Sequence, residues 1–316
     1  MRILITGGAG FIGSHLVDAY MEAGHEVAVL DNFVTGKREN LEGKQVRVYR
    51  ADLVDRAEVF RAFREFRPEV VSHHAAQMSV KVSTDDPVLD ANTNVVGLIN
   101  VLEAAVEVGA RKVIFASSGG TVYGDAAVIP TPEDAALQPM SPYGITKMVG
   151  EHYLRFFKAT HGLDFTTFRY GNVYGPRQDP HGEAGVVAIF ARRMLKGDRP
   201  LIHWDGEQRK DYVHVRDVAA ANVLALTEGS GRAYNIGSGV ATSVNELYTE
   251  LERQLQSGLA PEYGPRREGD VRLSFLAVDK ALAELGWRPE VTLGEGMVDT
   301  VAFFQKQVAL ERRLAA

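Results

Sequence analysis

The residues Ile3-Leu4-Ile5-Thr6-Gly7-Gly8-Ala9-Gly10-Phe11-Ile12-Gly13 stand almost at the start of the chain. The apolar run predicts a short buried strand, and Ser14 to Ala23 predicts a helix. A strand that turns through glycines into a helix presents free N–H groups and the positive end of the helix dipole to a phosphate. We expect Gly7 to form the tight turn, Gly10 to let a pyrophosphate approach, and Gly13 to let the helix pack on the strand.

A second predicted strand, Glu26 to Leu30, runs directly into Asp31. An acid at this place accepts hydrogen bonds from an adenosine ribose and repels a 2′-phosphate, so NAD is favoured over NADP. A glycine triplet alone is typical of an ordinary turn. Strand, glycines, helix, second strand and acid in succession predict a dinucleotide-binding fold.

Length and composition fit an α/β fold class: a Rossmann-type doubly wound parallel sheet with a smaller C-terminal α/β substrate-binding lobe. We expect residues 1–175 to form the NAD-binding domain, with a later segment (204–235) returning to it, and 176–316 to form mainly the second lobe.

The net charge of −6, without a basic run, argues against a nucleic-acid partner. No apolar stretch approaches the roughly 20 residues of a membrane helix. Cysteine is absent, which excludes thiol catalysis, and a cytoplasmic enzyme is the simplest interpretation.

Small and acidic residues follow the next predicted strands. Gly36 lies in a loop expected over the adenosine half of the cofactor, and Asp52, after a third strand, is expected either to accept from the adenine amino group or to cap the helix Asp55–Phe66. His74-Ala75-Ala76 follows a fourth strand, and its small residues permit close approach of a cofactor. His73 and His74 are adjacent and point to opposite faces, and no further ligands lie near, so no metal site is expected.

Two predicted helices carry polar residues of interest. Within Pro87–Glu107, Asn94 is the best candidate to hold a catalytic group, and the alternative is a surface amide. A later helix opens with Tyr143, and Lys147 lies four residues on, on the same face. An ammonium beside a phenol lowers the phenol's pKa from about 10 toward neutrality, which gives a base able to take a proton from a sugar hydroxyl. By itself this spacing is usually an exposed helix face. After a nucleotide fingerprint and the serine-rich strand end Ser117-Ser118, it indicates catalysis.

The chain resembles the extended short-chain dehydrogenase/reductase family and, within it, the UDP-glucose (UDP-galactose) 4-epimerases. The resemblance spans nearly the whole chain. It is carried by Thr6–Gly13, Asp31-Asn32, Thr121-Val-Tyr-Gly124, Ser141–Lys147, Arg169–Asn172, Asp211–His214 and Arg266–Asp270. It implies that Tyr143 takes the proton from the hydroxyl on sugar carbon 4 while NAD takes the hydride, and that the flat 4-keto sugar turns over before both return. Lys147 would bind the nicotinamide ribose.

The motifs and the resemblance together imply two sets of binding residues. NAD is expected to contact Gly7, Gly10, Phe11, Ile12, Gly13, Asp31, Asn32, Gly36, Asp52, Leu53, His74, Ala75, Ala76, Asn94, Ser117, Tyr143, Lys147 and Tyr170. The UDP-sugar is expected to contact Asn172, Val186, His203, Arg209, Arg267 and Asp270.

Two residues depart from the family pattern. The usual catalytic Ser or Thr, four residues before Tyr123, is Gly119 here, so the hydrogen bond to the reacting hydroxyl must come from Ser118, from Thr121 or from water. An arginine that often precedes the Asp211–His214 segment is Lys210, with Arg209 beside it, and a lysine offers a point charge instead of a planar fork.

The same residues argue against two related activities. Nucleotide-sugar 4,6-dehydratases carry an Asp-Glu pair where this chain has Gly120 and Thr121, and UDP-glucuronate decarboxylases need a similar acid there. A family reductase, or an epimerase of a UDP-N-acetyl sugar or a uronate, stays open. A non-catalytic NAD-binding regulator is the alternative from another class, but such proteins typically lose the Tyr–Lys pair.

Two long helices bear on the oligomeric state. The helices Pro87–Glu107 and Tyr143–Thr160 would either pair with their copies in a homodimer or simply pack on the sheet.

Overall fold

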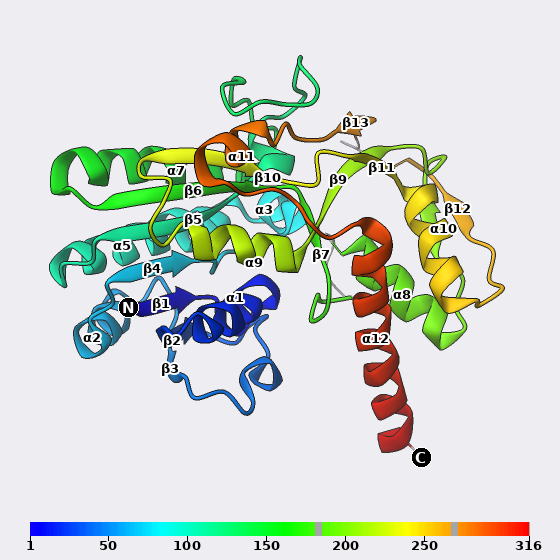
Figure 1. The fold of residues 1–316 in the computed structure, drawn as a ribbon, viewed down its shortest axis with the longest axis horizontal. Helices are drawn as coiled ribbons and strands as arrows, with labels where there is room; N and C mark the ends of the chain where they lie inside the picture. The colour runs from blue at the N-terminus through cyan, green and yellow to red at the C-terminus, as the bar shows by residue number, and fades with distance from the viewer. Residues whose placement is uncertain (181–184, 267–270, 316) are drawn as a thin grey trace.

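A seven-stranded parallel sheet forms the centre of the molecule, in the computed structural model that describes residues 1–180, 185–266 and 271–315. The strand order is β10-β6-β5-β4-β1-β2-β3. The strands are β1 (Arg2–Thr6), β2 (Glu26–Asp31), β3 (Arg47–Arg50), β4 (Val70–His73), β5 (Lys112–Ser118), β6 (Asp164–Tyr170) and β10 (Arg232–Ile236). Figure 1 shows helices on both faces of this sheet, which confirms the predicted doubly wound α/β fold.

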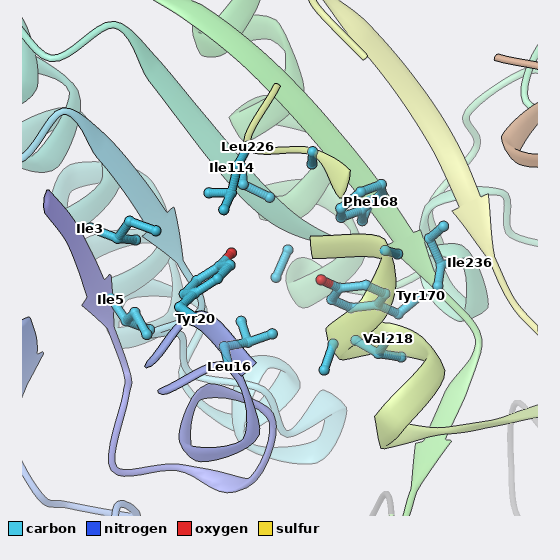
Figure 2. Packing of buried hydrophobic residues seen from close by; sticks show 14 of the residues in the cluster. Ile3, Ile5, Leu16, Tyr20, Ile114, Phe168, Tyr170, Val218, Leu226 and Ile236 are labelled. Atoms are coloured by element: carbon cyan, nitrogen blue, oxygen red, sulfur yellow. The ribbon is translucent and has the colours of Figure 1, made fainter. Parts of the chain in front are cut away.

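Alternate residues of β1 reach two separate hydrophobic cores, one on each face of the sheet. Ile3 and Ile5 pack with α1 (Phe11–Glu22) and α9 (Val215–Leu224), and Figure 2 shows Leu16, Tyr20 and Val218 in this core. Leu4 points the other way, into the core under α2 (Arg56–Phe66), α5 (Gly97–Glu107) and α7 (Pro142–His161). Burial on both faces explains the continuous apolar runs of these strands.

The predicted helix Pro87–Glu107 is interrupted. The structure has α4 (Pro87–Ala91), a π-helical turn at Asn92–Val96 and then α5. A π turn inserts one extra residue into a helix and is frequent at functional sites. Two short helices were not predicted: α3 (Val80–Asp85) and α6 (Gly119–Val122).

A second lobe lies beside the carboxyl ends of the main strands (Figure 1). Its strands are β7 (Asn172–Tyr174), β8 (Leu201–His203), β9 (Arg209–His214), β11 (Ala241–Ser243), β12 (Glu262–Gly264) and β13 (Leu273–Ser274). Its core is covered by α8 (Val186–Lys196), α10 (Val244–Leu255) and α12 (Leu293–Ala315). The remaining elements are a 3-10 turn at Arg38–Leu41 and α11 (Asp279–Leu285), which packs on the main core.

The chain crosses between the lobes more than once. Strand β9 pairs with β7, β11 and β13 in the second lobe, and α9 and β10 then return to the main sheet, where β10 pairs with β6. Among the described residues, no helix has the length and apolar character needed to cross a bilayer.

Candidate active site

The loops after β1 and β4 meet at the point where the strand order reverses, which is where ligands bind in such sheets. Gly7 has a φ of +70°, and a Cβ there would lie 2.7 Å from the backbone nitrogen of Ala75. Helix α1 begins at Phe11 with no side-chain cap from Gly10, and the N–H groups of a first helical turn can bind an anion. A cradle this tight, at the N-terminus of a helix, fits a dinucleotide pyrophosphate.

The acid expected at the ribose is buried at the end of β2. Asp31 is 5% exposed and accepts backbone hydrogen bonds from Ala9 (2.9 Å) and Phe33 (2.8 Å), and burial raises the pKa of its carboxyl. A Cβ on Gly36 would lie 2.7 Å from Asp31 Oδ1, so the loop closes directly over the acid.

Asn32 and Asp52 lie together at the ends of β2 and β3, because the Asn32 amide donates to Asp52 Oδ2 at 2.8 Å. The alternative that Asp52 caps the next helix is wrong, since Asp55 accepts from the backbone N–H of Glu58 instead.

The two adjacent histidines differ in exposure, since His73 is buried and His74 is half-buried, and both are neutral. Thr6 Oγ1 lies 2.9 Å from His73 Nδ1, and His74 Nε2 lies 3.0 Å from the Tyr170 hydroxyl. Burial lowers the pKa of His73 well below its usual value and that of His74 to about 3. Within residues 1–180, 185–266 and 271–315, no group of three or more His, Cys, Asp or Glu side chains is placed to hold a metal ion.

Tyr143 and Lys147 lie in the first turns of α7, at the carboxyl end of β5. The helix begins there because Ser141 accepts from the N–H of Gly144 (3.2 Å) and Pro142 suits the first turn. Lys147 is 4% exposed, its ammonium donates to the carbonyl of Ala116 at 2.8 Å, and its Nζ lies 5.7 Å from the centre of the Tyr143 ring.

The expected lowering of the Tyr143 pKa does not occur in the structure. Burial raises this pKa, the charge of Asp90 adds to the rise, and a hydrogen bond with Ser118 acts against it. Burial also lowers the pKa of Lys147 to about 8, which Asp90 opposes. The loss of water around the buried phenol disfavours the charged phenolate, and the spacing of Tyr143 and Lys147 in the sequence does not reveal this burial.

Both candidate hydroxyls lie near this pair. Ser118 ends β5 and hydrogen-bonds with Tyr143. Thr121 lies on the short helix α6, and its Oγ1 is buried with no hydrogen-bond partner among the described residues. A Cβ on Gly144 would lie 2.8 Å from the carbonyl of Thr121, so α6 abuts the start of α7.

A buried ion pair under the site was missed by sequence reasoning. Glu151 and Arg169 form two hydrogen bonds of 2.9 and 2.7 Å, with side chains 2% and 3% exposed. Ser117 donates to Glu151 at 2.8 Å, so its hydroxyl is occupied and a cofactor contact would use its backbone. Glu151 follows Lys147 by four residues on α7, and that spacing was the signal that could have revealed it.

Asn94 is buried in the π turn, which corrects the alternative of a surface amide. Its amide oxygen accepts from the N–H of Gln77 (2.8 Å), and its NH2 group donates to the Gln77 carbonyl (2.9 Å). It therefore holds the loop after β4 against α7. Ala76 lies in this loop, directly before Gln77.

The remaining predicted cofactor residues lie in the first lobe, on or after elements of the main sheet. Phe11 and Ile12 begin α1, and Leu53 is buried, with its carbonyl accepting from Asn100 at 2.9 Å. Tyr170 ends β6, and Figure 2 shows its ring in the core near Val218. Asn222 donates to its hydroxyl at 2.8 Å. A cofactor contact from Tyr170 would therefore use its backbone.

The expected substrate residues lie on second-lobe elements. Asn172 on β7 donates to the carbonyl of Asp211 (3.0 Å), Val186 begins α8, and His203 ends β8 with Nδ1 3.2 Å from the carbonyl of Pro265. Arg209 is paired with Glu246 at 3.0 and 3.2 Å, so its guanidinium is engaged at the start of α10. Arg267 and Asp270 lie outside the described residues.

The glycine cradle, the acid at the end of β2 and the Tyr–Lys pair lie at the carboxyl edge of one sheet, the arrangement of a Rossmann-type dinucleotide-binding protein. The chain belongs to the NAD dependent epimerase/dehydratase family, whose model matches residues 3–237. It is 46% identical to a UDP-glucose 4-epimerase of Mycolicibacterium smegmatis over 97% of this chain and 99% of that protein.

Two solved structures of UDP-glucose 4-epimerases are similar to this chain over nearly its whole length. The UDP-glucose 4-epimerase of Thermotoga maritima with UDP-glucose is 48% identical, with a TM-score of 0.95 over 98% of this chain and 100% of that one. The enzyme of the same name from Thermus thermophilus, in complex with NAD, is 48% identical, with a TM-score of 0.91 over 96% and 99% of the two chains.

Proposed function

We propose that this chain is an NAD-dependent isomerase that interconverts UDP-glucose and UDP-galactose through a 4-keto intermediate. The observation that carries the proposal is the position of Tyr143 and Lys147 at the carboxyl end of β5, on the same edge of the sheet as the glycine cradle after β1, with the hydroxyls of Ser118 and Thr121 nearby. The similarity to UDP-glucose 4-epimerases over nearly the whole chain supports the choice within the family.

Bound NAD would supply the hydride acceptor, and the residues of this chain would do the rest. Gly7, Gly10 and the start of α1 would hold the pyrophosphate, and Asp31 the adenosine ribose. Tyr143 would take the proton of the sugar hydroxyl and later return it. Lys147, fixed by the Ala116 carbonyl, would keep a positive charge next to the phenolate.

We propose different tasks for the two hydroxyls. Ser118 already hydrogen-bonds with Tyr143, so it would orient the phenol and favour its charged form. Thr121 has a buried oxygen without a partner, and buried polar atoms are rarely left in this state. The sugar hydroxyl would complete the hydrogen bonding of Thr121.

The nucleotide sugar would lie between the main sheet and the second lobe, where Asn172, Val186 and His203 contact it, together with Arg267 and Asp270. Because Arg209 is engaged by Glu246, we propose that Lys210, which faces the other side of β9, contacts the substrate phosphates in its place. An epimerase of another UDP-sugar, with an N-acetyl group or a uronate, is the alternative. A panel of UDP-sugars tests this, and turnover of UDP-glucuronate alone would contradict our choice.

Substitution of Tyr143 by Phe tests the mechanism and separates an enzyme from an NAD-binding regulator. The variant lacks the base but keeps the ring, so we expect bound NAD to persist and turnover of UDP-galactose to fall by about 10²–10⁴-fold. Ultraviolet absorbance of the purified protein reports the cofactor, and a coupled assay reports UDP-glucose. Full activity in the variant would refute the role of Tyr143, and a wild-type protein that binds NAD but turns over no UDP-sugar would indicate a regulator.

We propose a homodimer formed through the α4–α5 region and α7. Val88, Leu89 and Val96 are 68%, 47% and 44% exposed, and Phe156 on α7 is 54% exposed. Apolar side chains gathered on two neighbouring helices favour a self-complementary interface. Light scattering in solution measures the mass, and a mass equal to one chain would contradict the homodimer.

We also propose a cytoplasmic location, which fractionation of the source cells would test.

A further inference from the structure

Asp90, on α4, is a carboxylate with no exposed surface. Its Oδ1 accepts from the side-chain amides of Gln77 (2.8 Å) and Asn94 (3.0 Å), and its Oδ2 accepts from the hydroxyl of Thr146 (2.9 Å). All three partners are neutral donors. A carboxylate has only acceptor oxygens, so three donors around it satisfy its hydrogen bonding.

Thr146 links this buried charge to the catalytic turn of α7. It lies between Tyr143 and Lys147 in the sequence, and its Oγ1 is also 3.0 Å from the carbonyl of Tyr143. Asn94, which holds the loop after β4, shares the same carboxylate. The end of α4 and the π turn that follows it therefore bring a carboxylate, Asp90, and a loop support, Asn94, to one point beside α7.

We propose that Asp90 is a positioning residue of the epimerase reaction, and that its buried negative charge balances Lys147 so that the Tyr143 phenolate stays basic enough to take the sugar proton. This rests on the proposed function, because it concerns the proton that Tyr143 exchanges with the sugar.

The balance of charge in the two states of the reaction supports the proposal. In the reactive state, with NAD bound and Tyr143 ionised, the ammonium and the oxidised nicotinamide would be positive, and the phenolate and Asp90 would be negative. The phenolate oxygen would take the sugar O–H proton, and NAD would supply the acceptor for the hydride of the same sugar carbon. Only the ammonium and Asp90 then remain charged. The sum is zero in both states, whereas without Asp90 each state would hold one unbalanced buried charge, which is costly in a poorly solvated site.

The other titratable groups around Asp90 cannot replace it. On β4, His73 and His74 are kept neutral, since burial lowers the pKa of His74 to about 3 and that of His73 well below its usual value. On α3, Lys81 and Asp85 form an exposed pair with side chains 68% and 61% accessible, so water screens them. On α7, the charge of Asp90 acts to raise the pKa of Tyr143 and that of Lys147.

The test is the pH profile of kcat for Asp90→Asn. An asparagine keeps the shape and the hydrogen bonds, since its oxygen can accept from Gln77 and Asn94 and its NH2 group can donate to Thr146. Without the charge, the pKa of Tyr143 and that of Lys147 both fall. We therefore expect both limbs of the profile to move by about one unit to lower pH, with kcat at the optimum reduced about tenfold because the phenolate is a weaker base. KM for the UDP-sugar and NAD content should not change.

Two controls separate charge from structure. Asp85→Asn removes an exposed carboxylate of the neighbouring helix and should leave the profile in place. Thr146→Val keeps the Asp90 charge but removes one hydrogen bond, so it should lower the melting temperature without moving the limbs. Asp90→Ser, also without the charge, replaces Asp90→Asn if that variant does not fold.

The result that overturns the proposal is a charge-free variant with lower stability and a wild-type pH profile, which would make Asp90 a purely structural residue. Failure of the proposed function is seen separately, in the absence of UDP-galactose turnover by the wild-type protein.

Discussion

Leu276 occupies the space into which a side chain at Gly119 would project. A Cβ atom built at position 119 would lie 2.7 Å from Leu276 Cδ1 and 3.2 Å from the carbonyl oxygen of Arg169. Leu276 is 3% exposed and belongs to a small core with Val122 and Tyr123. The absence of a hydroxyl at position 119 is therefore accompanied by packing that excludes one, and in the proposed mechanism Ser118 and Thr121 supply the hydroxyls beside Tyr143.

Gly119→Ser should fail to improve catalysis and should destabilise the fold. The new Cβ forces Leu276 out of its place, and such overpacking costs about 1–3 kcal/mol. Urea denaturation measures the loss. Gly120→Ser is the matched control: Gly120 is exposed, and a Cβ there would meet Ser118 Oγ only at 4.0 Å, so the stability of the variant should stay within about 0.5 kcal/mol of the wild type. A Gly119→Ser enzyme with wild-type stability and higher kcat would contradict this reading.

Ser118→Ala and Thr121→Val should affect the reaction in different ways. Ser118→Ala removes a hydrogen bond that lowers the pKa of Tyr143, so the acid limb of the kcat profile should move to higher pH. Thr121→Val removes a hydroxyl that has no partner among the described residues, so kcat should fall by about 10–100-fold with no loss of stability.

The two variants serve as controls for each other, since each retains the other hydroxyl. If Thr121→Val were fully active and Ser118→Ala inactive at every pH, the tasks proposed for the two residues would have to be exchanged. Bound NAD, read from the absorbance spectrum, should be unchanged in both.

His74 should make the protein less stable in acid. Its pKa is about 3 in the folded protein and 6.5 without burial, so between these values the unfolded chain binds the extra proton. The contribution of His74 to stability is therefore present above pH 6.5 and is lost as the pH falls toward 3.

Comparison with His74→Gln isolates this effect, because the other titrating groups are common to both proteins. From pH 6.5 down to 4, the unfolding free energy of the wild type should fall relative to that of the variant by at most about 1.4 kcal/mol per pH unit. Urea denaturation at several pH values measures the difference. If the unfolding free energies of the two proteins changed equally with pH, His74 would bind its proton in the folded protein at the same pH as in the unfolded chain, which would contradict the prediction.

The sequence predicted those parts of the fold that depend on local pattern. The apolar runs, the glycine loop and the acid after the second strand predicted a doubly wound parallel sheet, and the structure confirms it. The boundaries of α1 were predicted later than observed, because Phe11 and Ile12 belong both to the glycine motif and to the first turn.

Features set by distant contacts were not predicted. The π turn at Asn92–Val96 depends on Asn94 reaching Gln77, and the Glu151–Arg169 pair joins a helix to a strand. The predicted lowering of the Tyr143 pKa was wrong for the same reason, since the burial of the phenol cannot be inferred from the spacing of Tyr and Lys. Residue types at strand ends indicated where the site lies, but their partners had to come from the structure.

Strand β10 enters the main sheet only after the chain has built β7, α8, β8 and β9 of the second lobe. A fragment that stops at residue 175 would lack both this edge strand and the helix α9 that covers α1, and would leave the backbone of β6 unpaired along one side. The two lobes are thus interlaced along the chain and cannot be exchanged between relatives as one contiguous block. A chimaera that alters sugar preference must splice the second lobe in at several crossings, and evolution of this specificity is constrained in the same way.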